Sequence, residues 1–360
     1  STSKLAEMEN QTWKIVDPAT TVGQTNFFLP YQGANDKDIQ SRVAALYLKS
    51  CPDLAFVADH CRPYKREVGR RIKLGFVSAF LGKHTIGKLF QGLINGLDRN
   101  QFEIIVFHLG PDRRLEDKYL ASLSDHVDHF LCVPSQYLQA RMTISEMEPD
   151  IIYYTDIGME PVSYFLAFNR LAPVQCACWG HPVTTGIPNV DYFISWQIHE
   201  PKAASQHYSE ELILFSGFCT NYYPPSFASS IKGREAFGLN PDVNLYVCPQ
   251  SLFKFHPMFD DMLADILRQD KKAEIILLDG QQSNWGRLLK NRFSRSSLEL
   301  TKRLSILPRL SRIDYFHLIK LADVILDTPI FCGGNTSFEA LAAGKVVVTL
   351  PGEYMRGLFT

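Results

Sequence analysis

The stretch LADVILDTPIFCGGNTSFEALAAGKVVVTLPGE, residues 321–353, decides the fold because it places a strand, a glycine turn, a helix start and a second strand in succession. The apolar run ADVILDT predicts the first strand. The turn GGNTS then opens a helix whose first backbone N–H groups have no partner within the helix. These groups point toward the carboxyl edge of the sheet, where a diphosphate fits. The stretch therefore predicts an α/β unit that carries an anion site.

Polar residues in this turn are the first candidate ligand contacts. Gly334 permits close backbone approach, Asn335 begins the helix, and the hydroxyls of Thr336 and Ser337 add donors. Glu339 lies where a carboxylate can accept hydrogen bonds from a ribose diol. A capping box of Thr336 and Glu339 explains the same pattern without any ligand, and this segment alone leaves both explanations open.

A second segment, YVCPQSLFKFHP at residues 246–257, predicts another strand, a polar turn with Gln250 and Ser251, and an amphipathic helix. Lys254 lies just past the strand, between two phenylalanines. A lysine there can hold a phosphate as a point charge while its stem packs on the rings. The alternative is an ordinary surface lysine.

These segments carry a family resemblance. QSLFKFHP, then ADVILDTPIFCGGNTSFEAL, then VTLPGE, in this order, resemble the catalytic region of the O-GlcNAc transferase and SPINDLY family. The similarity begins at IKLGFVSAFLGKH, residues 72–84, continues through PDIIYYTDIG and LAPVQCACWGHPVTTGIPNVDYFIS, and runs to the last residue. GHPVTTG, GGNTS and GEYMRG are most similar to the bacterial branch, whose members often follow tetratricopeptide repeats.

The resemblance implies an inverting, metal-independent glycosyltransferase that moves a sugar, with N-acetylglucosamine the first expectation, from a UDP-sugar to a protein Ser/Thr hydroxyl. A protein N-glucosyl- or O-fucosyltransferase of the same fold, a sugar-nucleotide epimerase and an inactive sugar-nucleotide-binding scaffold stay open as alternatives. The implied fold is α/β, of the GT-B type, with two Rossmann-like domains facing a cleft. Because the family continues into further helices, we expect the C-terminal end of this chain to be truncated.

The resemblance also implies roles for particular residues. The expected catalytic residues are His84 and Lys254. The expected nucleotide-sugar-binding residues are Gln250, Ser251, Lys254, Tyr315, Gly334, Asn335, Thr336, Ser337 and Glu339. The expected acceptor or sugar pocket comprises His181, Pro182, Thr184, Thr185, Gly186 and Asp156.

Each assignment has a structural alternative. His84 lies in the turn before a helix and is suited to accept a proton or to hold the sugar, but it can also cap that helix. Bacterial relatives usually carry an aspartate and an aromatic residue where this chain has Phe80 and Leu81. Asp156, at the carboxyl end of the strand IIYYT, can reach a ligand, whereas Asp150 at the entry is expected to be structural.

Composition narrows the function classes. With 37 Lys and Arg against 38 Asp and Glu, the chain has no basic field for nucleic acid or acidic lipid, so anion binding must be local. The family resemblance implies a nucleotide sugar and a protein acceptor as partners.

Cys176 and Cys178 alternate on the strand-like run QCACW, which favours buried thiols over metal ligands. No metal triad is evident, and no cofactor is expected. No apolar run has the length of a membrane span and no signal peptide is evident, so we expect a cytoplasmic protein.

The domain organisation follows from alternating patterns. A chain of 360 residues with 46% hydrophobic content is long enough for two α/β domains. Residues 1–70 form a partly helical lead-in, residues 71–225 an acceptor-side Rossmann-like domain, and residues 233–360 an incomplete nucleotide-sugar-binding domain. Short apolar runs alternate with amphipathic stretches in both, which indicates parallel sheets covered on both faces. The proline- and serine-rich interval at residues 221–233 marks the boundary.

Overall fold

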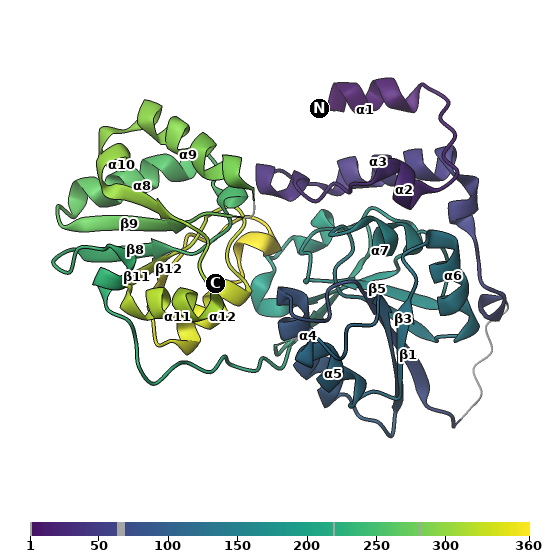
Figure 1. The fold of residues 1–360 in the computed structure, drawn as a ribbon. Coiled ribbons are helices and arrows are strands. Elements are labelled where there is room, and N and C mark those ends of the chain that lie inside the picture. Colours follow the sequence, from purple (N-terminus) through teal and green to yellow (C-terminus); the bar gives the residue numbers. More distant parts are fainter. Residues whose placement is uncertain (1, 63–68, 219, 281) are drawn as a thin grey trace. The chain divides into compact units, whose positions relative to one another are not determined.

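The structure is a computed structural model that describes residues 2–62, 69–218, 220–280 and 282–360. It forms two compact units (Figure 1). Unit 1 comprises Ser1–Pro30 and Ala34–Tyr223, and unit 2 comprises Tyr31–Gly33 and Pro224–Thr360. Apart from the short segment Tyr31–Gly33, the chain passes from unit 1 to unit 2 once, within the proline- and serine-rich interval.

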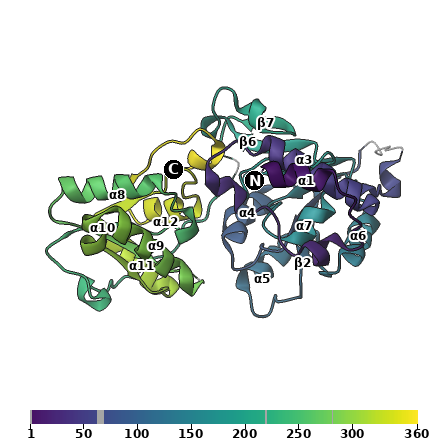
Figure 2. The same ribbon diagram turned by 90° about the horizontal axis from the view of Figure 1, so that it is seen from above.

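Unit 1 is a parallel sheet with helices on both faces. Its strands are β1 (Ile72–Ser78), β2 (Phe102–Leu109), β3 (His129–Val133), β4 (Ile151–Tyr154), β5 (Val174–Cys178), β6 (Tyr192–Trp196) and β7 (Glu211–Phe215). Its helices are α1 (Thr2–Glu9), α2 (Pro18–Val22), α3 (Lys37–Ser50), α4 (Thr85–Gly96), α5 (Lys118–Ser124), α6 (Tyr137–Glu146) and α7 (Pro161–Leu166). Helices α4 and α5 pack together on one side, and α6 and α7 on the other (Figure 2).

The strand order of unit 1 is β3-β2-β1-β4-β5-β6-β7, so the chain reverses its direction across the sheet between β1 and β4. Both neighbours pair with β1 in parallel; Phe76 lies opposite Val106 on β2 and opposite Tyr153 on β4. Helices that leave two such strands in opposite directions open a crevice at their carboxyl ends, and ligands of α/β proteins bind at such points. In unit 1 that point follows Ser78 and Tyr154.

Apart from Tyr31–Gly33, the described part of the lead-in belongs to unit 1. Val57 forms a parallel bridge with Arg170, supported by hydrogen bonds from the Ala58 amide to the Arg170 carbonyl (3.0 Å) and from the Arg170 amide to the Phe56 carbonyl (2.8 Å). Helix α2 packs against α7. The segment before β1 therefore packs on the helical layer of the sheet.

Unit 2 repeats the same plan. Its strands are β8 (Asn244–Cys248), β9 (Ala273–Leu278), β10 (Leu304–Leu307), β11 (Val324–Leu326) and β12 (Val347–Val348). Its helices are α8 (Met258–Gln269), α9 (Ser283–Ser296), α10 (Leu298–Arg303), α11 (Arg312–Leu321) and α12 (Asn335–Ala342). The parallel order β10-β9-β8-β11-β12 places the reversal between β8 and β11.

Alternating strand residues of unit 2 face two separate cores. Ile275 and Leu277 pack with α8, α9 and α10, whereas Ile276 between them packs with α11 and α12 (Figure 1). Because successive side chains on a strand point to opposite faces, a strand between two helical layers must be apolar throughout. That requirement explains the continuous apolar runs seen in the sequence.

Most predicted elements are confirmed. Strand β7 and helix α9 are among the elements that were not predicted; three of the five residues of β7, which lies at the sheet edge, are exposed. The expected buried thiols are confirmed, since Cys176 and Cys178 lie buried on β5 and the seven described cysteines are free. None of the described helices has the length and apolar character needed to cross a membrane.

Asp150 is structural, as expected, although it does more than cap a turn. It is buried at the entry of β4, where its carboxylate accepts two hydrogen bonds from Arg70 (2.5 and 2.6 Å) and one from the Lys73 amide (2.8 Å). The bidentate pair neutralises the buried charge and ties the entry of β1 to that of β4.

Candidate functional site

Nucleotide-side cluster in unit 2. The turn after β11 leads into α12, whose N-cap residue is Gly334 and carries no side-chain cap. Thr336 lies inside the helix and accepts a hydrogen bond from Gln250 Nε2 (2.8 Å). The capping-box alternative is therefore wrong: the helix begins before Thr336, and its hydroxyl is used by a neighbouring strand end. The amides of Ser337 and Phe338 donate to the Gly334 carbonyl (both 3.1 Å), and the start of α12 keeps the positive end of the helix dipole, which suits an anion.

Asp327 organises this turn, and sequence analysis did not single it out. The carboxylate is buried, and its Oδ1 accepts hydrogen bonds from Gln250 Nε2 (3.0 Å) and from the amides of Thr328 and Gly333 (both 2.8 Å). Its Oδ2 accepts one from the Thr349 hydroxyl (3.2 Å). One carboxylate thus joins the ends of β8, β11 and β12, the strands next to the reversal point. The available signal was its position, directly after the strand VIL in the quoted stretch.

Gly333 is required by close packing rather than by backbone conformation. A Cβ atom there would lie 2.4 Å from Gln250 Nε2 and 2.5 Å from the hydroxyls of both Thr336 and Ser337. At Gly334, by contrast, a Cβ atom would have nothing within 4 Å. The first glycine lets the polar cluster close, and the second leaves open space at the helix start.

Lys254 follows β8 at the same strand reversal. Its Nζ donates to Gln250 Oε1 (3.0 Å) and to the Cys332 carbonyl (2.9 Å), and it lies 4.9 Å from the centroid of the Phe331 ring. Among the described residues, no carboxylate forms an ion pair with it. Removal from water lowers the pKa of Lys254, and the Asp327 charge opposes that shift. A cation held by neutral acceptors gains strongly from an incoming anion.

Other predicted nucleotide-side residues occupy three kinds of position. Ser337 shares a hydrogen bond with the Thr360 hydroxyl (2.7 Å) and, like Asn335 and Glu339, is buried on α12. Ser251 is exposed in the turn after β8. Tyr315 lies on α11, partly buried, and packs against the core that also contains Leu318. The structure thus brings Gln250, Lys254 and the α12 start together around Asp327.

Tyr31 belongs to the same unit and was not predicted to. Its buried ring stacks on Phe331 with centroids 4.3 Å apart and meets Phe253 edge-on at 4.9 Å. The ring that faces Lys254 is therefore fixed by an aromatic residue from the lead-in. No sequence signal identifies this contact, because residues 31 and 331 are remote in the chain.

Acceptor-side cluster in unit 1. His84 is the N-cap residue of α4, and its Nδ1 accepts a hydrogen bond from the Ile86 amide (3.2 Å). This is the capping role considered from the sequence. An accepting Nδ1 places the proton of the neutral ring on Nε2, which then donates. Burial, and to a lesser degree Lys88, lower the pKa of His84, so the ring is neutral at pH 7. The tilted Phe80 ring packs beside it, with the two ring centroids 4.6 Å apart.

Asp156 follows β4 at the reversal point of unit 1 and is fully buried. Its Oδ2 accepts a hydrogen bond from the Ser78 hydroxyl (2.6 Å), and Ser78 Oγ accepts one from the Phe80 amide (2.8 Å). Oδ1 has no hydrogen-bond partner among the described residues. Burial raises the pKa of Asp156 to about 8, although the Ser78 bond lowers it. The group is therefore mostly protonated at pH 7 and can donate a hydrogen bond.

The loop after β5 is held by a buried carboxylate that was not predicted. Glu210 accepts hydrogen bonds from the Thr184 hydroxyl (2.6 Å), from the Thr185 amide (2.7 Å) and from the Thr185 hydroxyl. Thr184 Oγ1 also accepts from the Ser209 amide (2.9 Å). Both threonine hydroxyls thus use their protons internally and can offer a ligand only lone pairs. His181, Pro182 and Gly186 are buried in the same loop.

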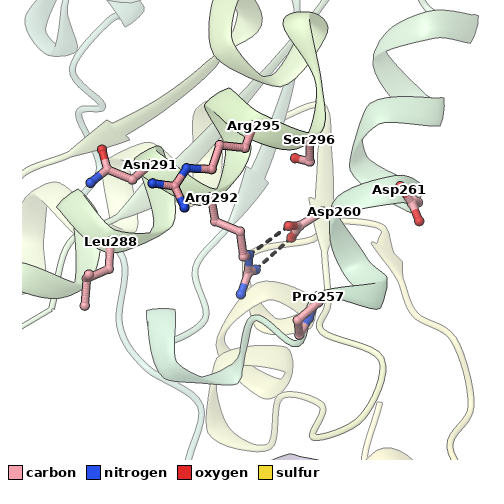
Figure 3. A pocket seen from close by; sticks show the side chains of 8 residues that line it. All are labelled: Pro257, Asp260, Asp261, Leu288, Asn291, Arg292, Arg295 and Ser296. Atoms are coloured by element: carbon pink, nitrogen blue, oxygen red, sulfur yellow. Dashed lines mark hydrogen bonds and ion pairs between the residues drawn. The ribbon is translucent and has the colours of Figure 1, made fainter.

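Two further features of the described residues, possible metal ligands and a surface hollow, do not add to the predicted site. No group of three or more His, Cys, Asp or Glu side chains among the described residues could hold a metal ion. A hollow of about 550 Å³ lies between α8 and α9, but none of the predicted site residues lines it. Figure 3 shows Asp260 and Arg292 paired within it, at 2.7 and 2.8 Å. This pair satisfies both charges and is structural.

Relationship to known proteins. Residues 18–223 and 224–357 match the model of glycosyl transferase family 41. The chain belongs to glycosyl transferase family 41. The resemblance inferred from QSLFKFHP and GGNTS is confirmed.

Curated relatives of this family 41 chain come from plants and bacteria. The probable UDP-N-acetylglucosamine–peptide N-acetylglucosaminyltransferase SEC of Arabidopsis thaliana is 25% identical over 301 residues, covering 81% of this chain and 30% of that protein. The protein named SPINDLY from the same plant is 25% identical, covering 79% and 31%. The UDP-glucose:protein N-beta-glucosyltransferase of Actinobacillus pleuropneumoniae is 28% identical over 150 residues, covering 41% and 24%. The chain thus spans about a third of the length of the two plant proteins.

Among solved structures, the O-GlcNAc transferase of Thermobaculum terrenum matches with a TM-score of 0.76 at 24% identity, covering 91% of this chain and 62% of that one. At this identity the match shows the fold. The predicted fold class, GT-B with two Rossmann-like domains, is confirmed by it.

Proposed function

We propose that this family 41 chain catalyses transfer of N-acetylglucosamine from its UDP donor to a serine or threonine hydroxyl of a protein, with inversion and without a metal ion. The observation that carries the proposal is the cluster in which Lys254, Gln250 and the α12 start converge on Asp327. This cluster offers a cation and a helix N-terminus at a strand reversal, two features that suit a diphosphate.

In the proposed reaction, different residues bind the donor, position the substrates and stabilise the departing diphosphate. The acceptor oxygen attacks C1 of the sugar, the bond from C1 to the diphosphate oxygen breaks, and the electron pair leaves with UDP while the hydroxyl proton is released. Lys254 and the amides at the α12 start stabilise the charge that grows on the diphosphate. Glu339 and Tyr315 contact the ribose and base. Inversion follows from a single displacement.

On the acceptor side, the neutral His84 donates through Nε2 to a substrate oxygen and keeps it in line. The hydrogen bond to Nδ1 supports this role over general-base catalysis, because the lone pair of Nδ1 is used by the Ile86 amide and Nε2 already carries the proton of the neutral ring. His181, Asp156 and the loop anchored by Glu210 shape the pocket for the sugar and the acceptor.

The relatives support the donor class. Two are named as UDP-N-acetylglucosamine–peptide transferases and one as a UDP-glucose:protein transferase. Because the sugars named for these relatives differ, the experiment includes UDP-glucose and GDP-fucose as rival donors.

Lys254→Met provides the test, with Lys320→Met as the matched control. Lys320 Nζ also lies over a phenyl ring, 4.8 Å from Phe227, but on α11. We expect Lys254→Met to lower kcat for transfer to an acceptor peptide at least 100-fold, a loss of about 2.7 kcal/mol of transition-state stabilisation. Lys320→Met should retain wild-type kcat.

Calorimetric titration with UDP, GDP, UDP-N-acetylglucosamine and UDP-glucose accompanies the kinetics. Selective binding of uridine diphosphates supports the proposal and ranks the sugars. Binding of UDP without transfer to any acceptor or hydrolysis would favour the inactive scaffold, and wild-type turnover by Lys254→Met would remove its role in departure of the diphosphate.

A further inference from the structure

The lead-in reaches the acceptor-side loops of unit 1 through the side chain of Phe27. Its ring stacks on the imidazole of His181, with centroids 5.3 Å apart and planes at 20°. His181 is only 5% exposed, so the stacked face is a buried contact. Phe27 lies in the lead-in, more than forty residues before the first strand of the α/β repeat.

His181 also lies against the turn after β4. A Cβ atom at Gly158 would lie 3.0 Å from His181 Cδ2, and Gly158 has a φ of +97°, so both space and backbone favour glycine. The Thr25 hydroxyl donates to the Gly158 carbonyl. The imidazole is therefore confined by the Phe27 ring and by the Gly158 turn, and Thr25 fixes that turn through its hydrogen bond.

The far end of the His181 loop also abuts the lead-in. At Gly186, with a φ of +70°, a Cβ atom would lie 2.3 Å from the carbonyl carbon of Gln40 and 2.5 Å from the Ser41 nitrogen. The Gln40 side chain in turn accepts a hydrogen bond from Asn26 Nδ2 (3.1 Å). The loop is thus fixed from two sides, by Glu210 and by the segment that carries Phe27.

We propose that Phe27 is a positioning residue for sugar transfer, which holds the His181 ring and its loop in the orientation that the reaction needs. This inference rests on the proposed function. Phe27 acts through His181, and its contribution is the fixed ring orientation: an unstacked imidazole can rotate about its side-chain bonds and would lose alignment with the substrate. Thr25 supports the same geometry through the Gly158 turn.

The test compares Phe27→Leu with Phe28→Leu. Phe28 is adjacent, is 53% exposed and meets Phe27 edge-on at 5.1 Å, so its loss removes similar apolar area without removing the stack. Thr25→Val and Thr25→Ser form a second pair, in which only the valine removes the hydroxyl that donates to Gly158.

We expect Phe27→Leu to lower kcat for transfer at least tenfold while the dissociation constant of UDP stays within twofold of wild type. Phe28→Leu and Thr25→Ser should keep wild-type kcat, and Thr25→Val should fall between. In proton NMR spectra, the His181 ring signals, assigned with a His181→Gln variant, should lose their ring-current shift in Phe27→Leu alone.

The outcomes separate the two proposals. Wild-type kcat in Phe27→Leu, or equal losses in Phe27→Leu and Phe28→Leu, would overturn the positioning role while leaving the transferase intact. A wild-type protein that transfers no sugar from any of the donors would overturn the proposed function, and the role of Phe27 in transfer with it. Circular dichroism of both leucine variants checks that they fold.

Discussion

At the scale of single residues, hydrogen bonds to side-chain atoms decide which chemistry each group can perform. His84 and Asp156 were both expected near the acceptor from their strand-end positions, but their protonation follows from partners and burial. A neutral imidazole with its proton on Nε2 and a carboxyl group that keeps its proton are both donors. His84 and Asp156 therefore present hydrogen-bond donors rather than a base.

His84→Gln tests this assignment. Because a glutamine amide can still donate to an oxygen, we expect this variant to keep kcat within about tenfold of wild type, whereas His84→Ala should lose at least 100-fold. The measurement is steady-state transfer with both substrates varied. Equal, severe losses in both variants, with the basic limb of the pH profile unchanged and the acidic limb removed, would restore the general-base role.

Asp156 makes a pH-dependent contribution to stability. Its folded-state pKa is raised to about 8, above its ordinary value of 3.8, so between these values the folded protein retains a proton that the unfolded chain has lost. The stabilisation is complete below about pH 4 and is lost as the pH rises toward 8.

We therefore expect Asp156→Asn to be more stable than wild type at pH 8 but not at pH 4.5. Urea unfolding at both pH values measures this, with the exposed Asp125→Asn as control. A free-energy difference between Asp156→Asn and wild type that is the same at pH 4.5 and pH 8 would show that Asp156 is ionised in the folded protein.

At the scale of elements, the turn between β11 and α12 contains one glycine needed for packing and one that leaves room for a ligand. Its two glycines differ in surroundings: Gly333 is enclosed by three polar side-chain atoms, and Gly334 faces open space. A Cβ atom at the first must displace Gln250 or Thr336, whereas a Cβ atom at the second meets only a ligand that approaches the backbone.

Gly333→Ala is accordingly expected to lower both the unfolding free energy, by about 1–3 kcal/mol, and the affinity for UDP at least tenfold. Gly334→Ala should leave the unfolding free energy within about 0.5 kcal/mol of wild type and still weaken UDP binding. Chemical denaturation and calorimetry distinguish the two. If Gly334→Ala bound UDP as the wild type does, the diphosphate would not lie against this helix start.

At the scale of the whole molecule, each of the two units carries one strand reversal with its own polar cluster. The nucleotide contacts proposed here all lie in unit 2. A ligand stabilises the part of the protein that binds it, by about 2.7 kcal/mol at a hundredfold excess over its dissociation constant.

Hydrogen exchange should therefore report UDP binding locally. We expect saturating UDP to slow exchange of amides in residues 327–338 and in the turn after β8, while amides of β2 and β3 in unit 1 keep their rates. Mass spectrometry of peptic fragments measures both regions, with uridine as the control ligand that lacks the diphosphate. Protection confined to unit 1 would move the nucleotide site away from Lys254.

The sequence by itself determined the alternation of strands and helices, the two sheets and the positions of His84, Asp156, Lys254 and the α12 turn at strand ends. Periodicity and turn composition are local properties, and buried parallel strands are apolar throughout, so these features can be predicted without the fold. The family followed from the same segments.

Only the tertiary structure decided which strand ends meet and what holds them. Gln250 and Asp327 lie 77 residues apart in sequence, and Thr25 and Gly158 lie 133 apart. The hydrogen bonds to the Asp327 carboxylate, those to the Glu210 carboxylate and the stack of Phe27 on His181 all depend on such pairings. A linear pattern carries no distance between remote segments, and the state of each polar group is set by the partners that folding places beside it.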